Sequence, residues 1–196
     1  YRDNETGMHV VRMSKGCQSL ALAIGHNEEF ADLLLLASPM HDVGKIGIPD
    51  RVLLKPGKLE ADEWEIMKTH VEIGGEILSS DSAEIMQLAR SIALTHHEKW
   101  NGSGYPNGLV GEDIPIQGRL AAICDVFDAL TSERPYKKAW TVEDAAALIR
   151  EESGSHFDPE LATKFLEILP KIIEIRVAHA DEEDKEYDIY DLAAAN

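Results

Sequence analysis

The chain has 196 residues, of which 44% are hydrophobic and 28% are charged, a composition typical of one globular domain with its own core. Its formal net charge of −17 argues against a polynucleotide substrate, because proteins that bind a nucleic-acid backbone are usually basic. No apolar run approaches the ~20 residues of a membrane helix, so we expect a cytoplasmic domain without membrane contact.

Apolar residues recur at helical spacing along most of the chain, which predicts an all-α fold: a compact helical bundle of roughly seven or more helices with little or no strand. Helices are expected at residues 3–25, 28–38, 59–66, 70–78, 82–98, 116–132, 141–150 and from 158 onward. Thr141 and Asp158 are typical helix N-caps. A short edge strand is expected near Val177. Packing roles are expected for Trp64, Trp100, Trp140 and the two cysteines, Cys17 and Cys124.

Histidine and carboxylate side chains occur on several of these expected helices as candidate metal ligands. The candidates are Glu5, His9, His41, Asp42, His70, His96, His97 and Asp125. Glu5 and His9 are four residues apart, which places them on one face of a helix. His41 and Asp42 are adjacent, about 100° apart on a helix, which suits a ligand pair between two ions. Mixed imidazole and carboxylate ligands suit iron, manganese, zinc, cobalt or nickel, and spacing alone leaves open that some histidines belong to the core.

Three motifs follow one another in the order and spacing of a known family. They are residues 41–49 (HDVGKIGIP), 100–106 (WNGSGYP) and 125–136 (DVFDALTSERPY). In this set the chain resembles the HD-GYP family, a branch of the HD-domain metal-dependent phosphohydrolases. The resemblance implies hydrolysis of cyclic di-GMP to linear pGpG, to GMP or to both, by attack of a metal-bridging hydroxide. It also implies that all eight candidates bind metal, with iron or manganese expected first, and Glu5 favours three ions over two.

Further roles are expected around the metals. Asp42 would bridge two ions, and Lys45, about one turn later, would point at the scissile phosphate or the nucleophile. The resemblance implies that Arg134 and Lys137 bind phosphate or guanine, with surface cations as the alternative. Tyr105 in the Gly-rich loop is expected to contact the substrate too, with a loop anchor as the alternative. Asp128 is expected to orient a metal-bound histidine, with a surface charge on its helix as the alternative, and Glu98 is a weaker candidate for the same role.

The expected organisation is a catalytic domain at residues 1–170 and an acidic C-terminal tail or extension at residues 171–196. The chain opens at Tyr1 rather than at methionine, which suggests an upstream sensor or receiver domain outside it. Two other functions stay open: a hydrolase of a related cyclic dinucleotide such as cyclic GMP-AMP, and a non-catalytic module that senses cyclic dinucleotides. In the second case the Gly-Tyr-Pro loop would dock other signalling domains. The sequence also leaves a homodimer open.

Overall fold

The computed structural model of the chain describes residues 7–80, 82–133 and 138–181. Over these ranges the fold is all-helical, as predicted, and the extended pairing is limited to two isolated bridges. The α-helices are α1 (Gly7–Ala23), α2 (Glu28–Ala37), α3 (Asp50–Leu53), α4 (Ala61–Lys68), α5 (His70–Ile77), α6 (Glu84–Thr95), α7 (Ile116–Thr131), α8 (Val142–Glu151), α9 (Pro159–Glu167) and α10 (Leu169–Ala178). Short 3-10 turns are η1 (Ser38–Met40), η2 (Val43–Gly47), η3 (Leu78–Ser80) and η4 (Gly111–Asp113).

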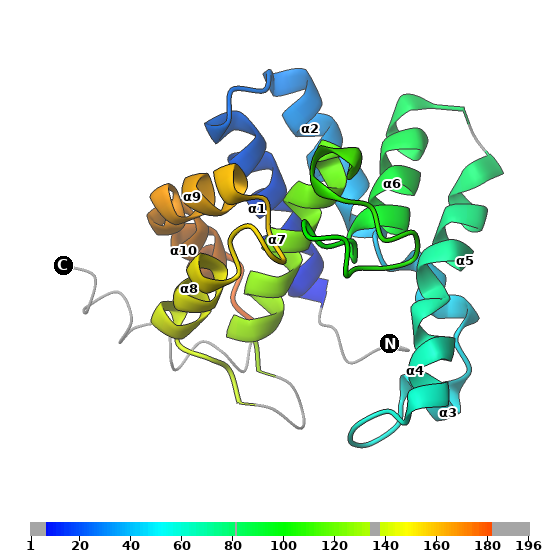
Figure 1. Ribbon diagram of the computed structural model, residues 1–196. Coiled ribbons are helices and arrows are strands. Elements are labelled where there is room, and N and C mark those ends of the chain that lie inside the picture. Colours follow the sequence, from blue (N-terminus) through cyan, green and yellow to red (C-terminus); the bar gives the residue numbers. More distant parts are fainter. Residues whose placement is uncertain (1–6, 81, 134–137, 182–196) are drawn as a thin grey trace.

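Helices α1 and α7 lie side by side in the middle of the bundle (Figure 1). Helices α2 and α6 pack on one side of this pair, with α5 beyond α6, and α8, α9 and α10 pack on the other side. The main core lies between these layers. Its fully buried large side chains include Met13, Leu20, Leu34, Ile92, Leu120, Ile123, Ile149 and Phe165.

Small residues let α7 approach both of its neighbours closely. A Cβ atom on Gly118 would lie 2.1 Å from Thr95 Oγ1 at the end of α6, so only glycine fits where α6 and α7 meet. A Cβ atom on Gly16 would lie 3.3 Å from Cys124 Sγ, where α1 crosses α7. These close approaches hold the start of α7 against the end of α6, and the middle of α7 against the middle of α1.

Helix ends agree with the local signals in the sequence. Thr141 Oγ1 accepts a hydrogen bond from the backbone N–H of Asp144 at 3.1 Å. Asp158 Oδ1 accepts from the N–H groups of Glu160 and Leu161 at 2.9 and 3.3 Å. Both predicted N-caps are therefore confirmed.

The last part of the described chain differs from expectation. Val177 lies in α10, so the expected edge strand is wrong: the helix buries Ile172 and Arg176 and packs against α1. The boundary expected between residues 170 and 171 falls inside this helix, and residues 182–196 lie outside the described ranges. Among the helices described, none is both long and apolar enough to cross a membrane. Cys17 and Cys124 are both buried and free.

Candidate metal centre

The His41–Asp42 pair lies in a sharp turn between η1 and η2 rather than on a regular α-helix. The backbone N–H of His41 donates to Ser38 O at 3.1 Å and that of Lys45 donates to Asp42 O at 3.0 Å, which gives a 3-10 turn on each side. The turn packs directly on α5 at Gly44. A Cβ atom there would lie 1.9 Å from the carbonyl oxygen of His70, so the motif needs glycine at this position.

Seven of the eight candidate ligands come together in two adjoining groups. Within each group, the ligand atoms all lie within 4.8 Å of one another. The first group is Asp42, His70, His96 and His97, and the second is His9, His41 and Asp125. They come from α1, the η1–η2 turn, the start of α5, the residues just after α6, and α7. Glu5, the eighth candidate, lies outside the described residues.

Asp42 belongs to the first group and also faces the second. Its Oδ1 atom is 3.1 Å from His70 Nε2 and 3.6 Å from His96 Nε2. Its Oδ2 atom is 3.3 Å from His41 Nε2, in the other group. One carboxylate thus presents one oxygen to each group, as a ligand that bridges two ions would.

Backbone carbonyls fix the orientation of three imidazoles. His41 Nδ1 donates to Ser38 O at 2.9 Å, His70 Nδ1 to Met67 O at 2.7 Å, and His96 Nδ1 to Ile92 O and Ala93 O, both at 3.1 Å. A carbonyl oxygen can only accept, so Nδ1 must carry the proton in each ring. The neutral ring then presents its Nε2 lone pair to the cluster, the arrangement that metal-binding histidines require.

The atoms that face the centre of the first group are buried and rich in electrons. His70 Nε2, His96 Nε2 and Asp42 Oδ1 make no hydrogen bond of acceptable geometry. Buried polar atoms without such a bond are unusual in folded proteins, and lone pairs that face one another repel. A divalent cation would satisfy all three atoms at once, so the residues present fit a metal site.

The protonation states suit the same use. Burial lowers the pKa of His97 well below its usual value, and the neighbouring His96 adds to this, so His97 is neutral at pH 7. His97 therefore offers a neutral imidazole to the first group.

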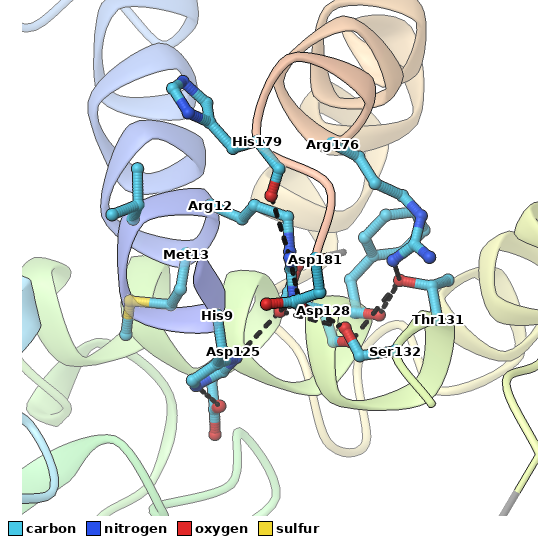
Figure 2. A network of polar contacts seen from close by, with 12 residues as sticks. His9, Arg12, Met13, Asp125, Asp128, Thr131, Ser132, Arg176, His179 and Asp181 are labelled. Atoms are coloured by element: carbon cyan, nitrogen blue, oxygen red, sulfur yellow. Dashed lines mark hydrogen bonds and ion pairs between the residues drawn. The ribbon is translucent and has the colours of Figure 1, made fainter. Parts of the chain in front are cut away.

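The two ring nitrogens of His9 contact different aspartates, Nε2 facing Asp125 and Nδ1 facing Asp128 (Figure 2). His9 Nδ1 donates to Asp128 Oδ2 at 2.8 Å, which leaves His9 Nε2 on the side of Asp125, 3.4 Å from Oδ1. Asp128 is only 5% exposed, so it is not a surface charge. Its burial raises its pKa, but His9 and Arg12 outweigh this and lower it, so Asp128 is ionised.

Lys45 lies at the rim of the cluster, where its Nζ atom is 2.7 Å from Asp42 Oδ2. Tyr105 covers the cluster from the other motif: its ring stacks on His97 with centroids 4.8 Å apart. Trp64, expected to pack, is 46% exposed and meets the Tyr105 ring edge to face at 6.3 Å. An aromatic surface thus runs outward from the cluster. Arg134 and Lys137 lie outside the described residues.

Glu98 has a different role from the one considered for it. Its side chain is buried and accepts hydrogen bonds from the backbone N–H groups of Asn107 at 2.8 Å and Leu109 at 3.1 Å. Gly104 lies directly on the backbone beside it, where a Cβ atom would be 2.3 Å from Lys99 N. Glu98 therefore holds the loop that carries Tyr105. In the sequence, only its position next to His97 indicated that Glu98 has a role at the site.

Comparison with known proteins agrees with this geometry. The HD domain family matches residues 2–161 of the chain. The 3'3'-cGAMP-specific phosphodiesterase 2 of Vibrio cholerae serotype O1 is 52% identical over 92% of this chain, and the match covers 34% of that protein. A cyclic di-GMP phosphodiesterase of Thermotoga maritima is 46% identical over 93% of this chain and 50% of its own length. The chain thus spans half or less of the length of these relatives.

Solved structures share the fold at low sequence identity. The cyclic GMP-AMP specific phosphodiesterase V-cGAP3 of V. cholerae has a TM-score of 0.64 at 19% identity, covering 92% of this chain and 48% of that chain. An HDG"Y"P protein from Bdellovibrio bacteriovorus also has a TM-score of 0.64, at 20% identity, covering 83% of this chain and 51% of that chain. These two likenesses support the helical architecture alone.

Proposed function

The chain belongs to the HD domain family, and we propose that it is a metal-dependent phosphodiesterase that opens cyclic dinucleotides, with cyclic di-GMP as the first candidate substrate. The observation that carries this proposal is the convergence of His70 Nε2, His96 Nε2 and Asp42 Oδ1 in a buried place without hydrogen bonds. The products would be linear pGpG, GMP or both.

The two groups of ligands would hold two ions, with Asp42 between them, and iron or manganese is the expected metal. Glu5 would add a third ion, as the family resemblance implies. Divalent ions held there would lower the pKa of a water molecule and offset the charge that builds on the phosphate. The chain's own contribution is to orient the ligands, because carbonyls and Asp128 fix the imidazole rings before any ion binds.

Lys45 would act on the phosphate itself. Its ammonium group is 2.7 Å from Asp42 Oδ2 and its side chain is 19% exposed, so it faces both the cluster and the space a substrate would enter. From there it can donate a hydrogen bond to a phosphate oxygen or a proton to the leaving ribose oxygen. Both actions stabilise negative charge that grows in the transition state.

The aromatic surface beside the cluster would hold a base of the substrate. Tyr105 stacks on His97, and Trp64 extends this surface outward with nearly half of its side chain exposed. Stacking of a base on an aromatic ring contributes about 1–3 kcal/mol and does not depend strongly on which base it is. Arg134 and Lys137 remain proposed contacts to phosphate or guanine.

A second candidate substrate is 3'3'-cyclic GMP-AMP. It is favoured by the relative that is 52% identical, whose name describes it as specific for 3'3'-cGAMP. Phosphate contacts and stacking do not distinguish guanine from adenine, so the centre described here fits either dinucleotide.

One assay tests the function. Protein loaded anaerobically with Fe(II) or Mn(II) is incubated separately with cyclic di-GMP, 3'3'-cGAMP and a mononucleotide, and products are resolved by chromatography. We expect a cyclic dinucleotide to be opened, and Asp42→Asn to abolish this while the circular dichroism spectrum is kept. Asp144→Asn, on the exposed first turn of α8, is the matched control and should keep full activity. Tight binding of a cyclic dinucleotide without any cleavage would instead support the sensing and docking module.

A further inference from the structure

A buried arginine lies one turn after His9 on α1. Arg12 is 4% exposed and grips Asp128 at two points: Nε donates to Oδ1 at 2.7 Å and Nη2 donates to Oδ2 at 3.1 Å (Figure 2). A planar guanidinium bonded in this way fixes both the position and the plane of the carboxylate. Since Asp128 Oδ2 also accepts the bond from His9 Nδ1, Arg12 indirectly fixes the ring of His9.

The same guanidinium also holds the end of the described chain. Arg12 Nη1 donates to His179 O at 3.0 Å and to Asp181 Oδ2 at 2.8 Å, just after α10. Its Nη2 donates in addition to Ser132 Oγ at 2.9 Å. The five N–H groups of the guanidinium thus match five acceptors, from α7, the residue after it, and the segment after α10.

Stability alone explains this arrangement poorly. A buried ion pair often stabilises a fold no more than an apolar side chain of the same size would, because both charges must leave water. Arg176, a second buried arginine, lies on α10, and its Nη1 donates to Thr131 Oγ1 at 2.9 Å. Arg12 instead connects a candidate metal ligand at one end to the segment after α10 at the other.

We propose that Arg12 is a positioning residue that couples the segment at residues 179–181 to the metal centre, through Asp128 and His9. Contacts made after α10 then set how firmly the group of His9, His41 and Asp125 holds its ion. This inference rests on the proposed function, which supplies the metal. Coupling of this kind is reciprocal, so ion binding also steadies the segment after α10.

The test measures Mn(II) binding by titration under free-metal buffering, with circular dichroism and thermal unfolding of the metal-free protein as folding controls. Arg12→Lys keeps the charge but loses the two-point grip, and should raise the Mn(II) dissociation constant of one ion about 10–100-fold. Asp181→Ala removes a partner whose side chain is 19% exposed, and should raise the same constant by a smaller factor, about threefold or more, because Arg12 keeps its bonds to Asp128. If Arg12→Lys does not fold, Asp181→Ala carries the test.

Two matched controls should bind Mn(II) within about twofold of the wild type. Arg176→Lys changes a second buried arginine, and Glu174→Ala removes an exposed carboxylate of α10 that pairs with Lys171. Hydrogen exchange at residues 179–181 gives a second readout: Mn(II) should slow it in the wild type and not in Arg12→Lys, a dependence that a purely structural arginine would not produce.

The outcomes separate the two proposals. Wild-type affinity for both ions in Arg12→Lys and Asp181→Ala would overturn the coupling, even if the wild type hydrolyses cyclic dinucleotides. A wild type that binds no Mn(II) would overturn the proposed metal centre, and the coupling with it.

Discussion

The backbone of η2 lies so close to α5 that one added methyl group at Gly44 should disturb the metal centre. An alanine Cβ there would lie 1.9 Å from His70 O and 2.5 Å from Gly74 N. Because Cβ atoms are essentially never found under 3.0 Å from such atoms, Gly44→Ala must separate the two backbones by about 1.1 Å. Neither obstacle is a flexible side chain, so the backbone itself has to move.

The size of the effect follows from this displacement. Overpacking costs about 1–3 kcal/mol of unfolding free energy, which lowers the Tm of a domain of this size by about 2–12 °C. The same movement carries Asp42, two residues earlier, away from His70, where Oδ1 and Nε2 are now 3.1 Å apart. We therefore expect Gly44→Ala to weaken metal binding as well as stability.

Thermal unfolding of the metal-free protein and Mn(II) bound per chain at a fixed free concentration measure the two effects. Gly7→Ala, at the start of α1, is the matched control, because a Cβ there would meet nothing within 4 Å. It should leave the Mn(II) content unchanged and should not lower the Tm, because alanine favours a helix more than glycine does. A Gly44→Ala protein with wild-type Tm and wild-type Mn(II) content would show that the packing of the His–Asp turn on α5 is described wrongly.

Three further predictions concern the loop, the lysine and a histidine outside the centre. Glu98→Ala should raise KM with little change in bound metal, because the loop that carries Tyr105 loses its anchor. Steady-state kinetics and metal analysis measure the two quantities, and a loss of bound metal would contradict this role of Glu98. Lys45→Met should lower kcat about 100-fold or more at similar metal content; an unchanged kcat would remove the lysine from the reaction. Burial and the positive charge of Lys99 lower the pKa of His156 from 6.5 to about 4 in the folded protein. As the pH falls, His156 is therefore protonated in the unfolded state before it is protonated in the folded state. Stability should therefore decrease from about pH 6.5 to pH 4, and His156→Gln should flatten that slope in urea unfolding; an identical slope would refute the assignment.

Much of the fold could be predicted from local signals. Helical spacing of apolar residues and the caps at Thr141 and Asp158 place most helices within a few residues of where they lie. The strand expected near Val177 is wrong because the β-branched residues there favour a strand only locally. In the folded protein, residues 169–178 form a helix because Ile172 and its neighbours pack against α1.

The candidate ligands could be chosen by residue type and by family motif, but the residues that support them could not. Arg12 meets its partners across 116 and 167 residues of chain, and no local pattern announces such contacts. Glu98 shows its role only through the loop that folds over it. Trp64 has the sequence context of a packing residue, and only the structure shows that it is exposed beside Tyr105, where we propose that a base binds.

The central claim is that two adjoining sets of side chains hold two ions, and anomalous diffraction from crystals grown with Fe(II) or Mn(II) tests it most directly. We expect one peak among Asp42, His70, His96 and His97, and a second among His9, His41 and Asp125. The two peaks should be about 3.5–4 Å apart, with Asp42 touching both. Crystals of the loaded protein in which the imidazoles keep their present orientation but no peak lies among them would contradict the claim.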